Sequence, residues 1–116
     1  MWVFTKDGFY SIVSKDCQPN EVQIKTRSEL DLHNLCNKLN ISPPIIKEEF
    51  DGYPYRTIIN KNLWISYLTD YVNDIDYDNV RNHIIDREDN QRKDAYKKVW
   101  KTMYNWMGIS SNLYDD

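Results

Sequence analysis

Asp7-Gly8 stands between two short runs of residues that favour β-structure, 2–6 and 9–14. Asp-Gly in this setting is a strong hairpin signal, because the two-residue type I′ turn needs residues that accept a positive φ. The sequence therefore predicts an antiparallel hairpin over 2–14, in which Thr5 lies opposite Tyr10.

Side-chain alternation gives this hairpin two apolar faces. One face carries Trp2, Phe4, Phe9 and Val13, and the other carries Val3, Tyr10 and Ile12. Helices can cover one face, whereas a flanking loop, a partner, a ligand or a second copy has to cover the other. A domain of 14.0 kDa covers one face more easily than both, so we expect a homodimer or higher oligomer that associates through the sheet or its edge.

Regular patterns continue after the hairpin. Strict alternation over 21–27 predicts a half-buried strand with a basic outer face. Ser28 is expected to cap a helix over 29–39, with Asp31 at its third position. Residues 53–60 form a further predicted strand, and 45–50 could add a short edge strand despite the preceding prolines.

Apolar residues recur at helical spacing in the second half of the chain, over about 62–75, 79–88 and 91–107. Asn60 or Asn62 is expected to cap the first of these helices, and Gly108 to stop the last. We therefore predict one α+β domain over 1–116, with a frayed tail over 110–116. Its antiparallel sheet (β-β-β-α-β) is packed on one face by about four helices, three of them C-terminal. The predicted core holds Trp2 or Val3, Phe4, Ile12, Val22, Ile24, Leu32, Leu35, Ile59, Trp64, Leu68, Trp100 and Met103.

The composition and charge of the chain limit the classes of function that it can have. A net charge of −3 and a pI of about 5.3 are too acidic for a general binder of duplex nucleic acid. There is no basic leader with an apolar stretch and no long apolar run, so we expect a cytoplasmic protein without a membrane partner. Cys17 and Cys36 form no C-x-x-C pair and are expected to be free thiols.

Few residues suit catalysis or metal binding. His33 and Cys36 lie three positions apart on one predicted helix and could pair, but a surface histidine beside a core cysteine is the simpler interpretation. Asp74, Asp76 and Asp78 alternate like the start of an EF-hand loop, yet the glycine and closing glutamate of such a loop are missing. We therefore predict a protein that is not an enzyme and uses no cofactor or metal.

The segment Tyr53-Pro54-Tyr55-Arg56 opens a predicted strand with two aromatic rings and a guanidinium. A planar ligand could stack on the rings while its phosphate or carboxylate pairs with the arginine. Basic groups beside rings suit a nucleotide or single-stranded nucleic acid, although they also suit a protein interface or an ordinary sheet. The candidate ligand-binding residues are Tyr10, Lys25, Arg27, Tyr53, Tyr55 and Arg56.

Four separated segments follow one another along the chain: MWVFTKDGFYSIV, YPYR, IDYDNVR and YKKVWKTMY. In these segments, and in their order, the chain resembles a family of short, uncharacterised bacterial and phage proteins. The resemblance extends over nearly the whole chain and implies a single-domain protein of the bacterial or phage-infected cytoplasm. It carries over no catalytic residue, since it brings no activity with it.

Two functions from different classes follow from these observations. The first is a non-enzymatic binding module that sequesters a nucleotide or oligonucleotide signal, in a phage or bacterial defence setting. The alternative is a protein-interaction module, such as an inhibitor or adaptor, that acts on a host protein through its helical face. An enzyme is the third and least supported interpretation.

Overall fold

A computed structural model describes residues 1–80, 84 and 90–108, and the chain divides into two compact units, 1–76 and 77–116. Most of the helix predicted over 79–88 and all of the tail predicted over 110–116 lie outside the described residues. The single domain over 1–116 stays a prediction.

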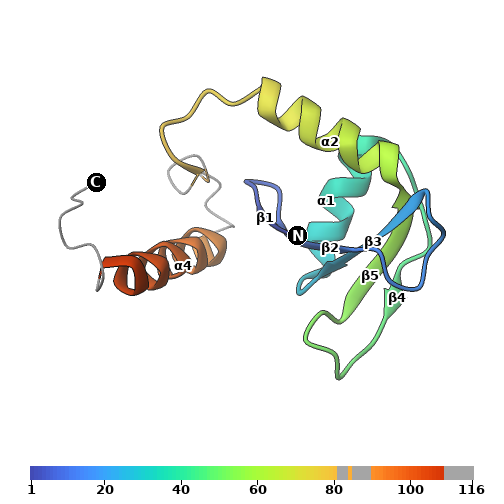
Figure 1. The fold of residues 1–116 in the computed structure, drawn as a ribbon, viewed down its shortest axis with the longest axis horizontal. Helices are drawn as coiled ribbons and strands as arrows, with labels where there is room; N and C mark the ends of the chain where they lie inside the picture. The colour runs from blue at the N-terminus through green and yellow to red at the C-terminus, as the bar shows by residue number, and fades with distance from the viewer. Residues whose placement is uncertain (81–83, 85–89, 109–116) are drawn as a thin grey trace. The chain divides into compact units, whose positions relative to one another are not determined.

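The first unit contains a five-stranded antiparallel sheet in the order β1-β2-β3-β5-β4 (Figure 1). The strands are β1 (Trp2–Phe4), β2 (Phe9–Val13), β3 (Glu21–Thr26), β4 (Ile46–Lys47) and β5 (Tyr55–Asn60). The helices are α1 (Glu29–Leu39), α2 (Lys61–Asn73) and, in the second unit, α4 (Asn90–Gly108). The α+β class and the antiparallel sheet are confirmed. The predicted order β-β-β-α-β left β4 out, although an edge strand over 45–50 was considered possible. The described residues form three helices, two of them C-terminal, instead of about four.

The hairpin β1–β2 forms, but its register differs from the predicted one. Phe4 lies opposite Phe9, and the backbone N–H of Thr5 donates to the carbonyl of Gly8 at 2.9 Å. Thr5 therefore does not face Tyr10, because one strand is displaced by two residues relative to the prediction. A displacement of two preserves the alternation, so each side chain keeps its predicted face.

Gly8 is required for space and not for its backbone conformation. Neither Asp7 nor Gly8 has a positive φ, so the predicted type I′ turn is wrong. A Cβ at Gly8 would lie 2.7 Å from the hydroxyl of Tyr10 and 2.8 Å from Cβ of Asp31. The missing side chain thus lets the turn approach α1 closely.

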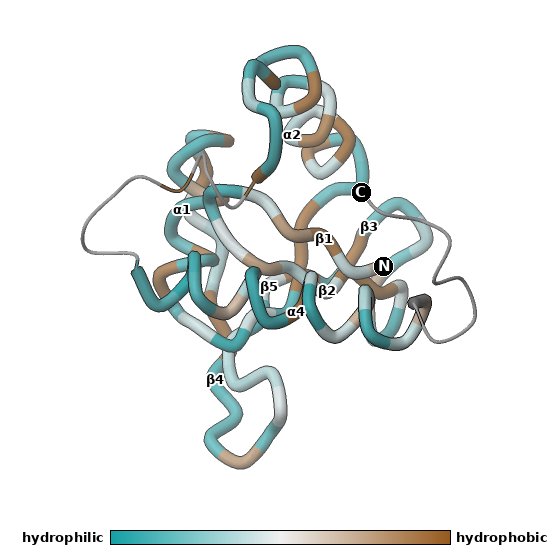
Figure 2. The backbone as a smooth tube through the Cα atoms, turned by 90° about the vertical axis from the view of Figure 1, so that its left-hand side faces the viewer, coloured by the Kyte–Doolittle hydropathy of each residue, from teal (hydrophilic) through white to brown (hydrophobic). Residues whose placement is uncertain are grey.

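Helices α1 and α2 both cover one face of the sheet (Figure 1). Strand alternation sends Ile12, Val22 and Ile24 to this face, and Figure 2 shows hydrophobic stretches along the strands. The core cluster consists of Tyr10, Ile12, Val22, Ile24, Leu32, Leu35, Ile59, Trp64 and Tyr67. Phe4, a predicted core residue of β1, points to the other face. Of the alternatives Trp2 and Val3, Val3 packs against the core.

The helix caps follow the sequence only in part. The side chain of Asn60 accepts a hydrogen bond from the N–H of Asn62 at 2.8 Å and caps α2, as predicted. The side chain of Ser28 makes no such bond at the start of α1. The carboxylate of Asp31 accepts instead from the N–H of Phe9 at 2.9 Å, which ties α1 to β2.

Two tyrosines of α2 hold the β1–β2 turn. The hydroxyl of Tyr67 donates to the carboxylate of Asp7 at 2.8 Å and lies 2.9 Å from the hydroxyl of Thr5. The hydroxyl of Tyr71 accepts from the backbone N–H of Lys6 at 3.0 Å. Burial raises the pKa of Tyr67 well above the ordinary range, so its hydroxyl keeps its proton.

In the second unit, α4 carries its predicted stripe of large apolar residues. Tyr96 of this stripe is buried, whereas the stripe is exposed from Val99 onward. Trp100 is 47% exposed and Met103 is 52% exposed, although both were predicted in the core. The ring of Trp100 stacks on that of Tyr104 with centroids 5.3 Å apart. Periodicity thus identified the amphipathic helix correctly and misassigned its environment.

Candidate functional site on the outer face of the sheet

The face of the sheet that points away from α1 and α2, which we call the outer face, combines aromatic and basic side chains. Trp2 and Phe4 of β1 lie beside Phe9 of β2, and Lys25 of β3 lies opposite Arg56 of β5. Because the register of each strand pair is fixed, these residues form rows that run across the strands. The rows bring together residues far apart in the chain.

The aromatic row is continuous from β1 toward the segment before β5. The ring of Phe9 stacks on Phe4 at 4.5 Å and meets Trp2 edge-on at 6.0 Å. It also lies 6.2 Å from the ring of Tyr53, and the guanidinium of Arg27 lies over Tyr53 at 5.0 Å from the ring centroid. Such a surface offers π-faces and a cation together.

Lys25 and Arg56 place two like charges directly opposite each other in the β3–β5 ladder. Like charges in this arrangement destabilise a sheet. The carboxylate of Asp51 reduces the repulsion, since it lies 2.7 Å from the guanidinium of Arg56. With Arg27 included, these residues leave the outer face with more positive than negative charge, in a chain that is acidic as a whole.

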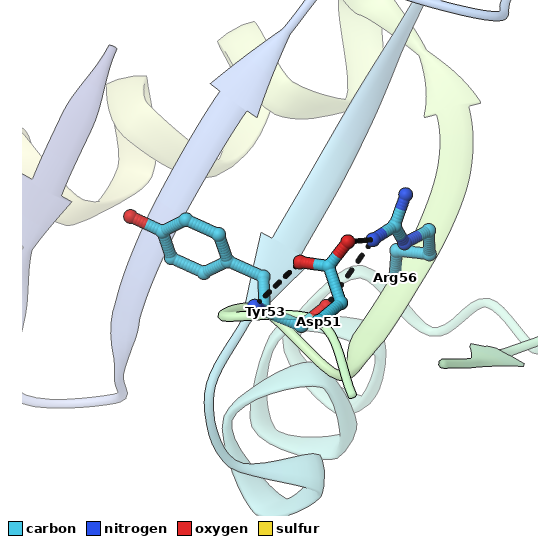
Figure 3. Close-up of polar contacts among 3 residues, drawn as sticks. All are labelled: Asp51, Tyr53 and Arg56. Atoms are coloured by element: carbon cyan, nitrogen blue, oxygen red, sulfur yellow. Dashed lines mark hydrogen bonds and ion pairs between the residues drawn. The ribbon is translucent and has the colours of Figure 1, made fainter. Parts of the chain in front are cut away.

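Asp51 is held between two neighbours (Figure 3). Its Oδ1 accepts from the backbone N–H of Tyr53 at 2.8 Å, and its Oδ2 pairs with Nη2 of Arg56. The bond from Tyr53 is the main reason that the pKa of Asp51 lies below its usual value, and the pair with Arg56 lowers that pKa further. The side chain of Arg56 is only 12% exposed, against 39% for Asp51. Arg56 is therefore already paired with an acid of this chain.

Two buried polar atoms near this pair lack hydrogen-bond partners among the described residues. They are Oε1 of Gln23 and Nε of Arg56. Gln23 lies between Val13 and Ile58 in the ladder and is 3% exposed. An unsatisfied buried polar group costs about 1–3 kcal/mol, so these two atoms lower the stability of this part of the sheet.

The structure brings together four of the six predicted site residues and separates two. Lys25, Arg27, Tyr53 and Arg56 lie on the outer face. Tyr10 is fully buried, and its hydroxyl donates to the carbonyl of Asp31 at 2.9 Å. Tyr55 lies opposite the buried Thr26 and packs against the core. Tyr10 therefore does not reach the outer face, because β2 directs it toward the helices.

The sequence interpretation did not nominate the rings that complete the site. Trp2, Phe4 and Phe9 were placed together on one apolar face, but not beside the basic strand. Alternation showed that the three rings share a face. Their closeness to Lys25 depends on the pairing of β2 with β3, which the sequence pattern does not show.

The residues considered for catalysis and metal binding do not form a site in the described part of the chain. His33 is exposed, 3.9 Å from Glu29, and Cys36 is buried, which raises its pKa. Cys17 and Cys36 are free thiols, as predicted. Asp74 ends α2, and within the described part of the chain no three His, Cys, Asp or Glu side chains are grouped to hold a metal ion. No helix among those described is long and apolar enough to cross a membrane.

Comparisons of the chain with known protein families, with curated proteins and with solved structures found no match. The resemblance to short bacterial and phage proteins therefore stays a prediction, and the function is argued from the outer face alone.

Proposed function

We propose that the outer face binds a nucleotide or a short single-stranded oligonucleotide, and that the protein is a binding module and not an enzyme. The observation that carries the proposal is the adjacency of the aromatic row to the basic pair Lys25 and Arg56. Unpaired bases stack on exposed rings, and phosphates need nearby cations. Single-strand binders use this pairing of surfaces without reading a sequence.

In this proposal the aromatic residues bind the bases and the basic residues bind the phosphates. The ring of Phe9, flanked by Trp2 and Tyr53, is the platform for a base. The guanidinium of Arg27 covers the Tyr53 ring and is exposed, so it can follow a phosphate beside a stacked base. Lys25 supplies a second charge in the centre of the sheet. We propose that the protein sequesters its ligand, a nucleotide or oligonucleotide signal, and that this sequestration serves phage or bacterial defence.

Fluorescence anisotropy with labelled oligonucleotides at low salt tests the proposal. We expect binding of single strands of about eight nucleotides, which suits the site size of a small sheet domain. Three cations predict a slope of about −2 in log affinity against log salt, at about −0.7 per phosphate contact. No anisotropy change with DNA or RNA single strands, and no calorimetric heat with mono-, di- or cyclic nucleotides, would end the proposal.

Matched variants distinguish stacking and charge from nonspecific attraction. Phe9→Ala is expected to weaken binding by about 1–3 kcal/mol, the usual contribution of one stacked base. Arg27→Ala is expected to reduce both the affinity and the salt slope, by about 0.7 in the slope. Lys38→Ala is the control, since Lys38 is an exposed cation of α1 on the other side of the sheet. Equal losses in Lys38→Ala and Arg27→Ala would show that the outer face is not the site.

A protein partner is the second candidate function, favoured by the exposure of Trp2. Its side chain is 68% exposed and touches Phe9 on the outer face. Tryptophan and arginine dominate the binding energy of many protein interfaces. An inhibitor or adaptor that uses this face would lose its partner on Trp2→Ala and show no response to nucleotides or oligonucleotides.

A further inference from the structure

Helix α4 has a broad apolar side that is exposed along its second half. The six large side chains on this side are 39–67% exposed: Val99, Trp100, Met103, Tyr104, Trp106 and Met107. At 3.6 residues per turn they occupy an arc of about 160° around the helix. In Figure 2 hydrophilic stretches alternate with paler and hydrophobic ones along α4, as expected of an amphipathic helix.

The helix as a whole is basic, and three of its lysines lie outside the apolar side. The helix contains five basic residues and one acidic residue, a net charge of +4, so the rest of this chain of charge −3 carries −7. Lys97, Lys98 and Lys101 lie on the polar arc, where Lys98 pairs with Asp94 at 3.0 Å. The positive charge of an acidic protein is thus concentrated on the helix that also exposes its largest apolar side.

We propose that α4 binds to the surface of an anionic lipid bilayer and lies parallel to it. A basic polar side opposite an apolar side with tryptophan is the pattern of helices that lie in the interface. Trp100, Tyr104 and Trp106 belong to the residue types that prefer the headgroup region, and the lysines would meet anionic lipids. This departs from the expectation of no membrane partner, which considered spanning segments only.

Two other occupants fit the surface less well. A second copy that packed its α4 against this one would bring a second charge of +4 to the same place, and the two would repel. A groove in a partner protein takes a narrow row of anchors spaced by three or four residues. The arc of about 160° is wider than such a row and suits a flat surface.

Co-sedimentation of the full chain with vesicles tests the proposal. Vesicles of phosphatidylcholine with about 30% phosphatidylglycerol are expected to bind the protein at low salt, and pure phosphatidylcholine vesicles much less. High salt should weaken the binding to anionic vesicles. No sedimentation with anionic vesicles, or equal sedimentation with both kinds, would overturn the proposal. Binding to soluble polyglutamate without binding to vesicles would also overturn it, in favour of an acidic protein partner.

Two variants of α4 show whether this helix is responsible. Neutralising Lys97, Lys98 and Lys101 to Gln is expected to weaken vesicle binding about 100-fold, at about fivefold for each lysine. The matched control neutralises Lys15, Lys38 and Lys61, which are exposed cations of the first unit. Met103→Ser with Trp106→Ser should also abolish binding.

The control for the apolar change is Ile65→Ser with Val72→Ser, because these residues of α2 are 52% and 61% exposed. All four variants change exposed positions, so their thermal melts should match that of the wild type. Vesicle binding that is lost equally in the α4 variants and in their controls would overturn the assignment to α4. Arg27 lies on the outer face of the sheet and not on α4, so Arg27→Ala should leave vesicle binding unchanged.

Discussion

The carboxylate of Asp51 lies 2.7 Å from the guanidinium of Arg56, at the edge of the basic pair that Arg56 forms with Lys25. A carboxylate in this position satisfies the guanidinium in the way that a phosphate oxygen would. Asp51 is therefore the internal competitor of any anionic ligand on the outer face. Substitution of Asp51 and substitution of Arg56 are therefore expected to change ligand affinity in opposite directions.

Asp51→Asn is expected to raise the affinity for single-stranded oligonucleotides by about threefold to tenfold, because one negative charge near the phosphates is removed. The amide oxygen can still accept from the N–H of Tyr53, so the local turn is kept. Anisotropy titration of this variant beside Glu49→Gln measures the effect. Glu49 is an exposed acid of the same loop, and an equal gain in both variants would show that the position of Asp51 is unimportant.

Arg56 itself is a poor probe of ligand binding, because its substitution also affects the fold. A surface guanidinium contributes little stability, but this side chain is only 12% exposed and holds Asp51. Arg56→Ala is therefore expected to lower stability as well as ligand binding, and Arg56→Lys to recover part of the binding, since lysine lacks the planar fork. Arg27 is exposed and is the cleaner position for a binding test.

Tyr67→Phe should lower the free energy of unfolding by about 1–3 kcal/mol, because it removes a buried hydrogen bond to the carboxylate of Asp7. Burial raises the pKa of Tyr67, so its contribution is complete below the ordinary tyrosine pKa of about 10 and is lost as the pH rises above it. The stability difference between wild type and Tyr67→Phe should therefore stay constant up to about pH 9 and shrink as the pH rises from about 10 to about 11.

Urea melts at several pH values measure this difference. The matched control is Tyr104→Phe, because Tyr104 is 44% exposed on α4 and the change should leave the melts nearly unaltered. A Tyr67→Phe protein as stable as the wild type at neutral pH would show that the bond to the β1–β2 turn is not formed.

The two tryptophans Trp64 and Trp100 should respond differently to truncation. Trp64 is 4% exposed and packs against Tyr67 and Tyr10, so Trp64→Ala should cost about 3–5 kcal/mol. Trp100 is 47% exposed, and Trp100→Ala should cost about 1 kcal/mol or less, mainly the stacking on Tyr104. A large loss for Trp100→Ala in urea melts would mean that the apolar side of α4 is covered within the protein.

How far the sequence predicted the molecule can be judged from particular residues. Alternation placed Trp2, Phe4 and Phe9 on one face, and helical spacing located α1 over Glu29–Leu39, because both depend on local periodicity. Gly8 was misinterpreted, since its need for space comes from Tyr10 and Asp31, which approach it through tertiary packing. Local sequence patterns do not predict such tertiary contacts.

The candidate site shows the same limit. The basic face of β3 was predicted from alternation, and Tyr53 and Arg56 were nominated from their chemistry. That Arg27 lies over Tyr53 depends on β3 pairing with β5 across many intervening residues, which no local pattern shows. Tyr10 was misplaced for a related reason, because both faces of its strand are apolar and only the position of the helices decides between them.

The expected homo-oligomer stays a prediction, and its test also bears on the site. If two copies associate through the outer face, they bury Trp2 and Phe9, and an oligonucleotide must compete with the dimer. Light scattering at micromolar concentration should then show a mass above the monomer that falls on addition of the oligonucleotide. A monomer throughout would exclude self-association, and a dimer that ignores saturating ligand would place the contact elsewhere.

The central claim is that the outer face of the sheet is the ligand site, and amide chemical shifts of isotope-labelled protein test it most directly. A titration with a single strand of about eight nucleotides is expected to shift the amides of Phe9, Lys25, Arg27 and Arg56. The amides of α1, on the covered face, should stay in place. Shifts concentrated on α1 and α2, or no shifts at saturating oligonucleotide, would contradict the account.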